Sequence, residues 1–223
     1  MSSVGIDLGA SAIHVVELTA SPHERLTITA ARSFDAADLE AVVALVHGAR
    51  DIAIDAPAQL STAPHAGDDS ISPKFRTARC GEIALGQDAG IWVPWVTPHD
   101  ASKVAGWMQV GFDLWQALRD AGHAPIEVYP AGVFRVLAGH VPPRKTTRAG
   151  ALARIELLAP FIELPPAIEM WSHDGIDALG AALTAHQKST GTAREIGHGE
   201  AICDGSAIWL PVTPGLNGAK IGG

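Results

Sequence analysis

The chain has 223 residues, of which 47% are hydrophobic and 18% are charged, a composition typical of a globular protein rather than a disordered one. This length suits one domain with a sizeable insertion, so we expect residues 1–223 to form a single domain. The net charge of −8 argues against a general nucleic-acid coat protein. It does not exclude an enzyme that gathers carboxylates around metal ions, because bound cations reverse the local charge.

The first residues lead directly into a short apolar segment, with neither a basic stretch nor a long apolar run. We therefore expect no signal peptide and no membrane span, and predict a cytoplasmic protein. Cys80 and Cys203 lie far apart in the sequence, form no metal-type pair and give no reason to expect an oxidising compartment. Cys80 follows Arg79 in a predicted helix, and we interpret it as buried and inert.

Apolar runs separated by turn residues predict an antiparallel meander of three strands at the start of the chain. A helix with Asp35 as its N-cap follows and ends near Gly48, and a fourth strand comes directly after it. Three strands, a crossover helix and a fourth strand are typical of a mixed α/β sheet. The four strands are expected at 4–9, 13–18, 26–34 and 51–55.

The segment 57–100 is irregular and rich in Pro, Gly, His and Trp, with one short helix predicted at 74–85. So long a segment inside a compact domain is usually functional, and we interpret it as an insertion. Near the C-terminal end, Asp204-Gly205 between two apolar runs predicts a hairpin over 201–209. The remaining predictions are a strand at 126–129 and helices at 102–121, 131–137, 146–158 and 172–186.

Three acidic residues stand where strands should be hydrophobic. Asp7 lies in the middle of an apolar strand, Asp55 ends another, and Glu127 lies in a third. Asp disfavours strands, and burying an unpaired carboxylate is costly, so these positions indicate a function. Solvated strand ends or turn caps also explain such residues, most readily for Asp55 because Ala56-Pro57 follows it.

Two further carboxylates, Asp174 and Asp177, share one face of the last predicted helix because they are spaced i and i+3. Both lie in its first turn, where the helix dipole favours anions, and that dipole alone would explain them. Small residues follow them at Ala178 and over 180–182. These allow the helix to lie close against a sheet, which would hold the pair near the strand carboxylates.

The carboxylates are best explained together. Two like charges about 4 Å apart repel by roughly 4 kcal/mol at an effective dielectric near 20, against a net domain stability of about 5–15 kcal/mol. If the groups converge, cations must lie between them, and all-oxygen ligands select Mg²⁺ or Mn²⁺. Two such ions can activate a water and stabilise the leaving oxygen of a phosphodiester.

The pattern resembles a known group of proteins. Gly5-Ile6-Asp7-Leu8-Gly9, two more strands, a helix and Ile54-Asp55 resemble the ribonuclease H-like superfamily. The run Asp174-Gly175-Ile176-Asp177-Ala178-Leu179 resembles the terminal helix of RuvC-type Holliday-junction resolvases. More specifically, the chain resembles an uncharacterised family of predicted nucleases with this fold. The stretches that match it are Ile54-Asp55-Ala56-Pro57, Glu127-Val128-Tyr129-Pro130, Lys145-Thr146 with Gly150 and Arg154, and Asp174 to Ala185.

The resemblance implies a mixed sheet, a three-stranded meander plus parallel strands, flanked by helices. It implies Mg²⁺ or Mn²⁺ as cofactor, a nucleic acid as substrate and a homodimer as an expected assembly. The implied metal ligands are Asp7, Asp55, Asp174 and Asp177, with Glu127 as a fifth catalytic carboxylate. The resolvases usually carry Glu where Asp55 stands, and the shorter side chain changes what this position can reach.

Basic and aromatic residues are candidates for contact with nucleic acid. Phosphate contacts are expected from Lys145, Arg148 and Arg154, and from Arg76 and Arg79 in the insertion. A solvated helix face explains such basic runs equally well. Base stacking is the functional interpretation, and core packing the ordinary one, for Trp92, Trp95 and Trp107.

The sequence therefore predicts a metal-dependent nuclease that hydrolyses phosphodiester bonds, and two alternatives stay open. One is a sugar-kinase or actin-like ATP-binding phosphotransferase, because residues 5–11 fit the first phosphate loop of that superfamily. Its second loop would have to be Asp204-Gly205-Ser206. The other alternative is a non-catalytic nucleic-acid-binding member of the fold, in which the carboxylates no longer bind metal tightly.

Overall fold

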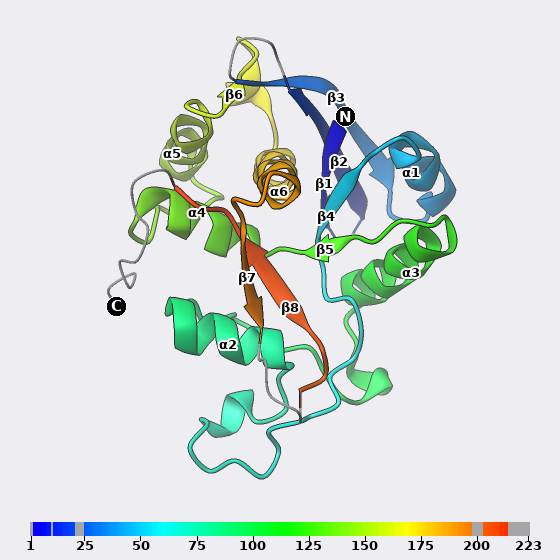
Figure 1. Cartoon of the computed structure of the whole chain (residues 1–223), viewed down its shortest axis with the longest axis vertical. Coiled ribbons are helices and arrows are strands. Elements are labelled where there is room, and N and C mark those ends of the chain that lie inside the picture. The colour runs from blue at the N-terminus through cyan, green and yellow to red at the C-terminus, as the bar shows by residue number, and fades with distance from the viewer. Residues whose placement is uncertain (1, 10, 21–24, 198–202, 214–223) are drawn as a thin grey trace.

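The structure is a computed structural model that describes residues 2–9, 11–20, 25–197 and 203–213. Its centre is a six-stranded sheet in the order β5-β4-β1-β2-β3-β6 (Figure 1). The strands are β1 (Ser2–Leu8), β2 (Ala12–Ala20), β3 (Leu26–Asp35), β4 (Asp51–Asp55), β5 (Ile126–Glu127) and β6 (Ile162–Glu163). The α-helices are α1 (Leu39–Val46), α2 (Cys80–Ala89), α3 (Gly106–Asp120), α4 (Pro130–Ala138), α5 (Arg148–Leu158) and α6 (His173–Ser189).

The sheet has the connectivity of the ribonuclease H-like fold. Strands β1, β2 and β3 form an antiparallel meander, and β4 returns beside β1 in parallel after the crossover through α1. Strand β5 continues the sheet in parallel beyond β4. This confirms the expected mixed sheet, because a parallel neighbour of β1 needs a crossover connection while the meander needs only tight turns.

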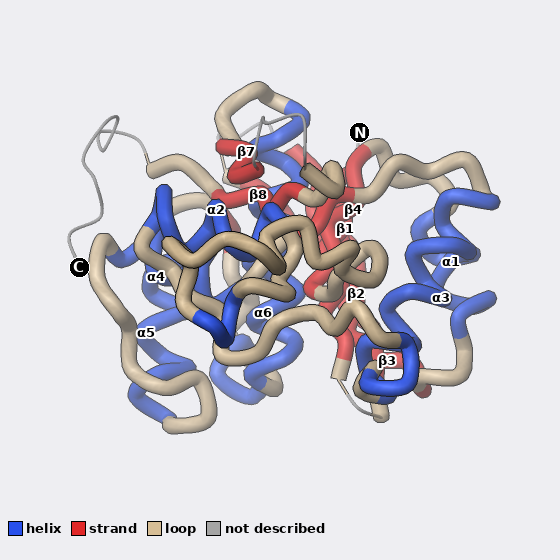
Figure 2. Tube along the Cα trace, turned by 90° about the horizontal axis from the view of Figure 1, so that it is seen from below, coloured by secondary structure: helices blue, strands red, loops and turns tan. Residues whose placement is uncertain are grey.

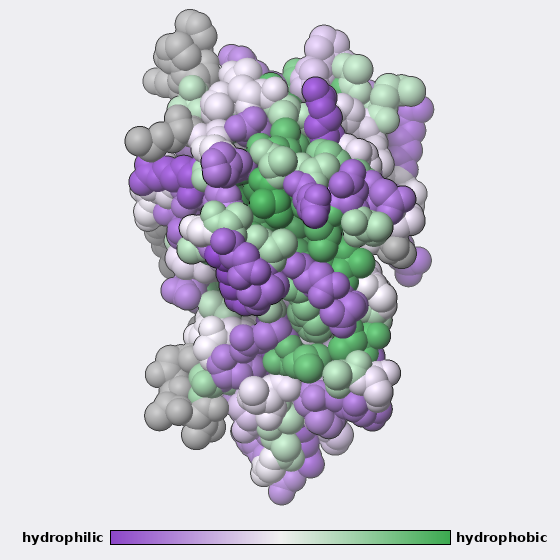
Figure 3. All heavy atoms as spheres, turned by 90° about the vertical axis from the view of Figure 1, so that its right-hand side faces the viewer, coloured by the Kyte–Doolittle hydropathy of each residue, from purple (hydrophilic) through white to green (hydrophobic). Residues whose placement is uncertain are grey.

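Alternation along β1 sends neighbouring side chains to opposite faces of the sheet. Val4, Ile6 and Leu8 contribute to a core formed with α1 and α3, and Figure 1 shows these two helices together on that side. On the surface of the same side, hydrophobic atoms form a band between hydrophilic ones (Figure 3). Gly5 and Asp7 therefore face the opposite layer.

The opposite layer is built around α6, which lies across β1, β2 and β4. A Cβ atom at Gly5 would lie 2.0 Å from the backbone oxygen of Ala178, so only glycine permits this approach. The small residues of α6 are fully buried, as the sequence predicts. Helices α4 and α5 cover α6 from outside and complete the second core.

The segment 57–100, which we call the insertion, packs against the C-terminal part of the described chain. Its helix α2 packs against a two-stranded sheet formed by β7 (Arg194–Gly197) and β8 (Ala207–Leu210). These segments share a third hydrophobic core, far apart in sequence but adjacent in space. Strand β8 also meets the main sheet through a parallel bridge between Val128 and Trp209. Seen from below, the loops of the insertion cross in front of α6 and the main sheet (Figure 2).

Several element boundaries differ from expectation. Asp35 ends β3 and accepts a hydrogen bond from the Ala37 amide, so Asp38 occupies the N-cap position of α1. The helix predicted at 74–85 is split into a short 3₁₀ turn, 73–75, and α2. Similarly, 3₁₀ turns at 101–103 and 168–170 flank the longer helices.

The first arm of the hairpin predicted over 201–209 includes residues 201–202, which lie outside the described part of the chain. Strand β8 pairs with β7, which the sequence did not indicate. The carboxylate of Asp204 accepts hydrogen bonds from the amide and hydroxyl of Ser206 and from the Cys80 amide.

The sequence predicts no pairing between the two cysteines and an inert Cys80, and this prediction is wrong. Cys80 and Cys203 are joined by a disulfide with Cα atoms 5.9 Å apart. A sequence separation of 123 residues conceals this proximity. Within the described residues, no helix is both long and apolar enough to cross a membrane.

Candidate metal centre

Two carboxylates lie side by side at the carboxyl ends of the central parallel strands. Asp7 and Asp55 are partners in the register of β1 and β4. Both are on the face that α6 covers, since Gly5 of the same strand contacts that helix. Asp7 is only 3% exposed, and its side chain forms a hydrogen bond with that of Asp55. Strand register alone therefore places this pair.

Helix α6 brings the other two carboxylates to the same point. Ser172 caps the helix by accepting a hydrogen bond from the Gly175 amide, so Asp174 and Asp177 occupy the first two turns and face the sheet. Carboxylate oxygens of Asp7, Asp174 and Asp177 lie within 4.8 Å of one another. The predicted convergence of strand and helix carboxylates is thus present in the structure.

Two cations compensate part of this negative charge. The ammonium group of Lys145 lies 3.0 Å from an Asp174 oxygen and 2.8 Å from an Asp177 oxygen. Arg154 on α5 forms a buried ion pair with the other oxygen of Asp177. Gly150 allows this arrangement, because a Cβ there would lie 2.0 Å from the backbone oxygen of Arg144, the neighbour of Lys145.

The pKa values reflect a site that is short of positive charge. Burial, and then the charges of Asp55 and Asp177, raise the pKa of Asp7 to about 10. Burial and the charge of Asp177 raise the pKa of Asp55 to about 7. Burial opposes ionisation of Asp174 too, but hydrogen bonding to Lys145 lowers its pKa overall. Lys145 therefore pairs directly with the α6 carboxylates and acts on Asp7 and Asp55 only as a nearby charge, and no ion pair to these two strand carboxylates occurs among the residues that the structure describes.

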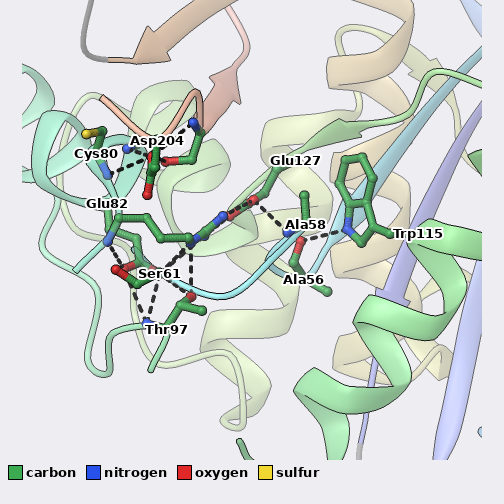
Figure 4. Close-up of polar contacts among 12 residues, drawn as sticks. Ala56, Ala58, Ser61, Cys80, Glu82, Thr97, Trp115, Glu127 and Asp204 are labelled. Atoms are coloured by element: carbon green, nitrogen blue, oxygen red, sulfur yellow. Dashed lines mark hydrogen bonds and ion pairs between the residues drawn. The ribbon is translucent and has the colours of Figure 1, made fainter. Parts of the chain in front are cut away.

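Glu127 has a different set of partners. The guanidinium group of Arg79 contacts both of its oxygens, at 2.7 and 2.5 Å, and Arg79 is 1% exposed. Arg79 also binds Glu82 and the Thr97 hydroxyl, and the Ala58 amide donates to Glu127 (Figure 4). Glu127 thus belongs to a buried network that joins β5 to α2 rather than to the three-carboxylate group.

The carboxylates line a pocket of about 450 Å³. Six carboxyl groups line it (Asp7, Asp55, Glu82, Glu127, Asp174 and Asp177), against three cationic groups (Arg79, Lys145 and Arg154). This is a formal excess of three negative charges in a largely buried space. Burying unpaired charge is strongly unfavourable, and three converging carboxylate oxygens are a ligand set that Mg²⁺ or Mn²⁺ fits.

Residues 5–201 match the family described as "Protein of unknown function (DUF429)". The chain belongs to the DUF429 family. The matched range contains every carboxylate of the pocket. Among curated proteins, none matches this DUF429 chain.

Two solved structures are similar to this DUF429 protein. A Thermus thermophilus RuvC structure is 17% identical, with a TM-score of 0.48, and the match covers 86% of this chain and 98% of that one. T. thermophilus RuvC in complex with a Holliday junction substrate is 14% identical, with a TM-score of 0.47 and coverage of 85% and 96%.

The basic and aromatic residues predicted to contact nucleic acid in this DUF429 chain differ in burial and in their partners. Arg79 and Arg154 are buried in ion pairs, so the structure gives both guanidinium groups carboxylate partners in place of the expected phosphate. Arg148 is exposed, with Glu169 4.0 Å away, and Arg76 binds Asp69 at the edge of the insertion. Trp95 is 62% exposed and lines the pocket.

Two residues of the buried network around Arg79 were not predicted from the sequence. Glu82 and Thr97 complete the Arg79 network, with the Thr97 hydroxyl 2.5 Å from a Glu82 oxygen. Glu82, three residues after Arg79, accepts a hydrogen bond from the Arg79 amide, which is the half of a capping box that a Glu in the first turn of a helix supplies. Nothing in the local sequence points to Thr97, because its segment is an irregular loop.

Proposed function

We propose that this protein is a divalent-metal-dependent nuclease that hydrolyses phosphodiester bonds of a nucleic acid. One observation carries the proposal: Asp7, Asp174 and Asp177 offer oxygens within 4.8 Å of one another at the end of the central strands. The site opens into a pocket that also holds uncompensated acidic groups and a partly exposed lysine. These carboxylates would hold a divalent cation, which would supply positive charge to a substrate phosphate.

Asp7, Asp174 and Asp177 would hold the ion, and Asp55, in register beside Asp7, would complete the ligand set. When bound, Mg²⁺ or Mn²⁺ supplies Lewis-acid stabilisation of a phosphoryl group and makes water a better nucleophile. The protein's own contribution is to fix these carboxylates rigidly. Asp7 and Asp55 are fixed by strand register, and Asp177 by its ion pair with Arg154.

Lys145 is also the proposed contact for a phosphate of the substrate. Its ammonium bridges Asp174 and Asp177, and 35% of its side chain is exposed toward the pocket. With a divalent cation held by the same carboxylates, the Lys145 ammonium would be free to contact a phosphate oxygen of the substrate from its place in the pocket lining. A lysine that exchanges one anionic partner for another in this way positions the substrate without reading its sequence.

Glu127 acts as a positioning residue in this proposal. Because Arg79 contacts both of its oxygens, Glu127 fixes the start of the insertion through the Ala58 amide. The floor of the pocket, from Asp55 to Ala58, is thereby held in place. Trp115 supports the same segment by donating a hydrogen bond to the Ala56 oxygen.

The proposal is tested by cleavage of labelled single-stranded DNA, duplex DNA, RNA, hybrid and four-way junction in Mg²⁺ or Mn²⁺. We expect cleavage that requires the metal and is abolished in Asp7→Asn and Asp177→Asn. The matched control is Asp113→Asn, since Asp113 is an exposed aspartate on α3 whose partner is Gln109. Each variant is checked for folding by circular dichroism.

Full metal-dependent cleavage in Asp7→Asn would contradict the assignment of the site. An absence of cleavage on every substrate, in wild-type protein shown by calorimetry to bind Mn²⁺, would leave a metal-binding protein that is no nuclease. Calorimetry with Asp177→Asn separates these cases, because loss of one of three oxygen ligands weakens Mn²⁺ binding whatever the reaction is.

A further inference from the structure

A second group of potential metal ligands lies away from the carboxylate pocket, where the insertion meets the C-terminal segment. Cys80 begins α2, and Cys203 and Asp204 lie in the loop before β8. Their sulfur and oxygen atoms all lie within 4.8 Å of one another. His65, from a third segment, places its Nε2 atom 3.5 Å from the Cys80 sulfur and is 6% exposed.

The two carboxylate oxygens of Asp204 differ in their partners. Its Oδ1 atom accepts hydrogen bonds from the Cys80 amide and from the amide and hydroxyl of Ser206. Its Oδ2 atom is buried and has no hydrogen-bond partner among the residues that the structure describes. A buried carboxylate oxygen without a partner is costly. Figure 4 shows Asp204 beside Cys80 at the start of α2.

We propose that His65, Cys80, Cys203 and Asp204 form a structural zinc site when the two cysteines are reduced. Two thiolates, one imidazole and one carboxylate are all established Zn²⁺ ligands, and four protein ligands make the closed tetrahedral set of a structural site. With Zn–S bonds of about 2.3 Å, ligand atoms of such a site lie roughly 3–4 Å apart. Cys80, Cys203 and Asp204 already lie within 4.8 Å of one another, and His65 lies 3.5 Å from the Cys80 sulfur, so the His65 side chain has to turn toward the other two ligands when the ion binds.

The disulfide and the zinc site are alternative states of the same cysteines. Two equivalents of a small thiol reduce the Cys80–Cys203 bond, giving two protein thiols and one oxidised small-molecule disulfide. Zinc then binds the two thiolates and displaces their protons, so the affinity rises with pH. Cys203 is partly exposed, which gives the reductant a sulfur to attack.

The location suits a structural rather than a catalytic ion. The ligands come from three segments of the lobe that the insertion forms with β7 and β8. A bound ion would hold these segments together without extending the hydrophobic core. Cys80 also follows Arg79, the residue that binds Glu127. Zinc at Cys80 would therefore hold the first turn of α2, and with it Arg79, against the loop before β8.

The test is an anaerobic titration of the reduced full-length protein with Co²⁺, after counting two free thiols per chain. We expect the thiolate-to-cobalt charge-transfer absorption to saturate at one Co²⁺ per chain and to be displaced by one equivalent of Zn²⁺. Co²⁺ bound in the carboxylate pocket does not contribute to this band, because carboxylate ligands do not produce it. Cys203→Ser should abolish the two-thiolate spectrum. His65→Ala and Asp204→Asn should weaken Zn²⁺ binding by at least about 10- to 100-fold, the range seen for loss of an outer-shell partner alone.

Asp7→Asn is the matched control, because it alters the carboxylate pocket and should leave the charge-transfer band unchanged. Reduced wild-type protein that shows no such band, and whose melting temperature does not rise with Zn²⁺, would overturn the proposal. A band of equal intensity and affinity in His65→Ala and Asp204→Asn would also overturn it, since the site would then be a simple pair of thiolates. The readout is independent of nuclease activity.

Discussion

Lys145 illustrates how a single residue carries two interactions in this site. The sequence places it in a basic run, and the structure places its ammonium between Asp174 and Asp177. The same group competes with a divalent cation for these carboxylates and is a candidate contact for a substrate phosphate. These two roles have opposite consequences for metal affinity and for catalysis, so one substitution separates them.

We expect Lys145→Met to bind Mn²⁺ more tightly, because the competing ammonium is gone, and to cleave substrate about 10- to 100-fold more slowly, the equivalent of one charge-assisted hydrogen bond. Calorimetry measures the first effect and cleavage kinetics the second. Arg148→Met is the control, since Arg148 is exposed on the same segment and has only a distant acidic neighbour, Glu169. Weaker Mn²⁺ binding in Lys145→Met would refute the competition.

Asp7 and Asp55 give the metal-free protein a characteristic dependence on pH. Their pKa values are raised in the folded state, to about 10 and about 7, relative to about 3.9 for an unfolded aspartate. The stability that their protonated forms contribute is fully present below the unfolded pKa. It is lost as the pH rises through the folded values, by up to about 1.4 kcal/mol per group for each pH unit crossed.

The melting temperature of metal-free protein should therefore fall between pH 6 and pH 8.5, and the increase caused by Mg²⁺ should be larger at pH 8.5. Thermal denaturation with and without chelator measures both. Asp55→Asn should flatten the metal-free profile, because an amide does not titrate. A metal-free melting temperature that rises over this range would contradict the assigned shifts.

At the scale of elements, the site depends on the close approach of α6 to β1. Gly5 permits that approach, since a Cβ there would lie 2.0 Å from the Ala178 oxygen and 2.2 Å from the Ala182 nitrogen. Both contacts are to backbone atoms of the helix, which cannot rotate away. Any side chain at position 5 therefore separates the helix carboxylates from those of the strands.

Gly5→Ala should lower the free energy of unfolding by about 1–3 kcal/mol or more, through overpacking, and should weaken Mn²⁺ binding in the molecules that still fold. Chemical denaturation and calorimetry provide the two values. Gly48→Ala is the matched control, because a Cβ at Gly48 meets no atom within 4 Å. Unchanged metal affinity in a destabilised Gly5→Ala protein would show that the helix carboxylates do not need this approach.

At the scale of the whole molecule, one buried ion-pair network joins the insertion to the main sheet. Arg79 at the start of α2 binds Glu127 of β5 and Glu82 of its own helix. The lobe around α2 has its own hydrophobic core, so this polar junction contributes to how that lobe is held against the pocket. Removing the cation leaves two buried carboxylates without their partner.

Arg79→Met should destabilise the protein by about 3–5 kcal/mol, the usual cost of breaking a buried ion pair by removing one partner. Arg76→Met should cost at most about 1 kcal/mol, because its partner Asp69 is 93% exposed. Denaturant unfolding of the two variants gives the comparison. A cost below about 1 kcal/mol for Arg79→Met would mean that the junction does not stabilise the fold.

The sequence by itself determined the order of the main elements and the four aspartates among the six carboxylates of the pocket. Strand alternation and helix spacing are local properties, so Asp7, Asp55, Asp174 and Asp177 are detectable as polar residues in apolar patterns. The small residues of α6 likewise predict a close contact with the sheet. Register and helix face then bring these residues together in the way the pattern indicates.

Only the tertiary structure decided which partners those groups meet. Glu127 looks like a fifth ligand in the sequence, yet Arg79, 48 residues away, occupies both of its oxygens. Cys80 and Cys203 look unrelated, and β7 is absent from the prediction, because both depend on how the insertion packs against the C-terminal segment. Ion pairs and sulfur contacts across such distances are set by the packing of whole elements, which no local pattern of residues encodes.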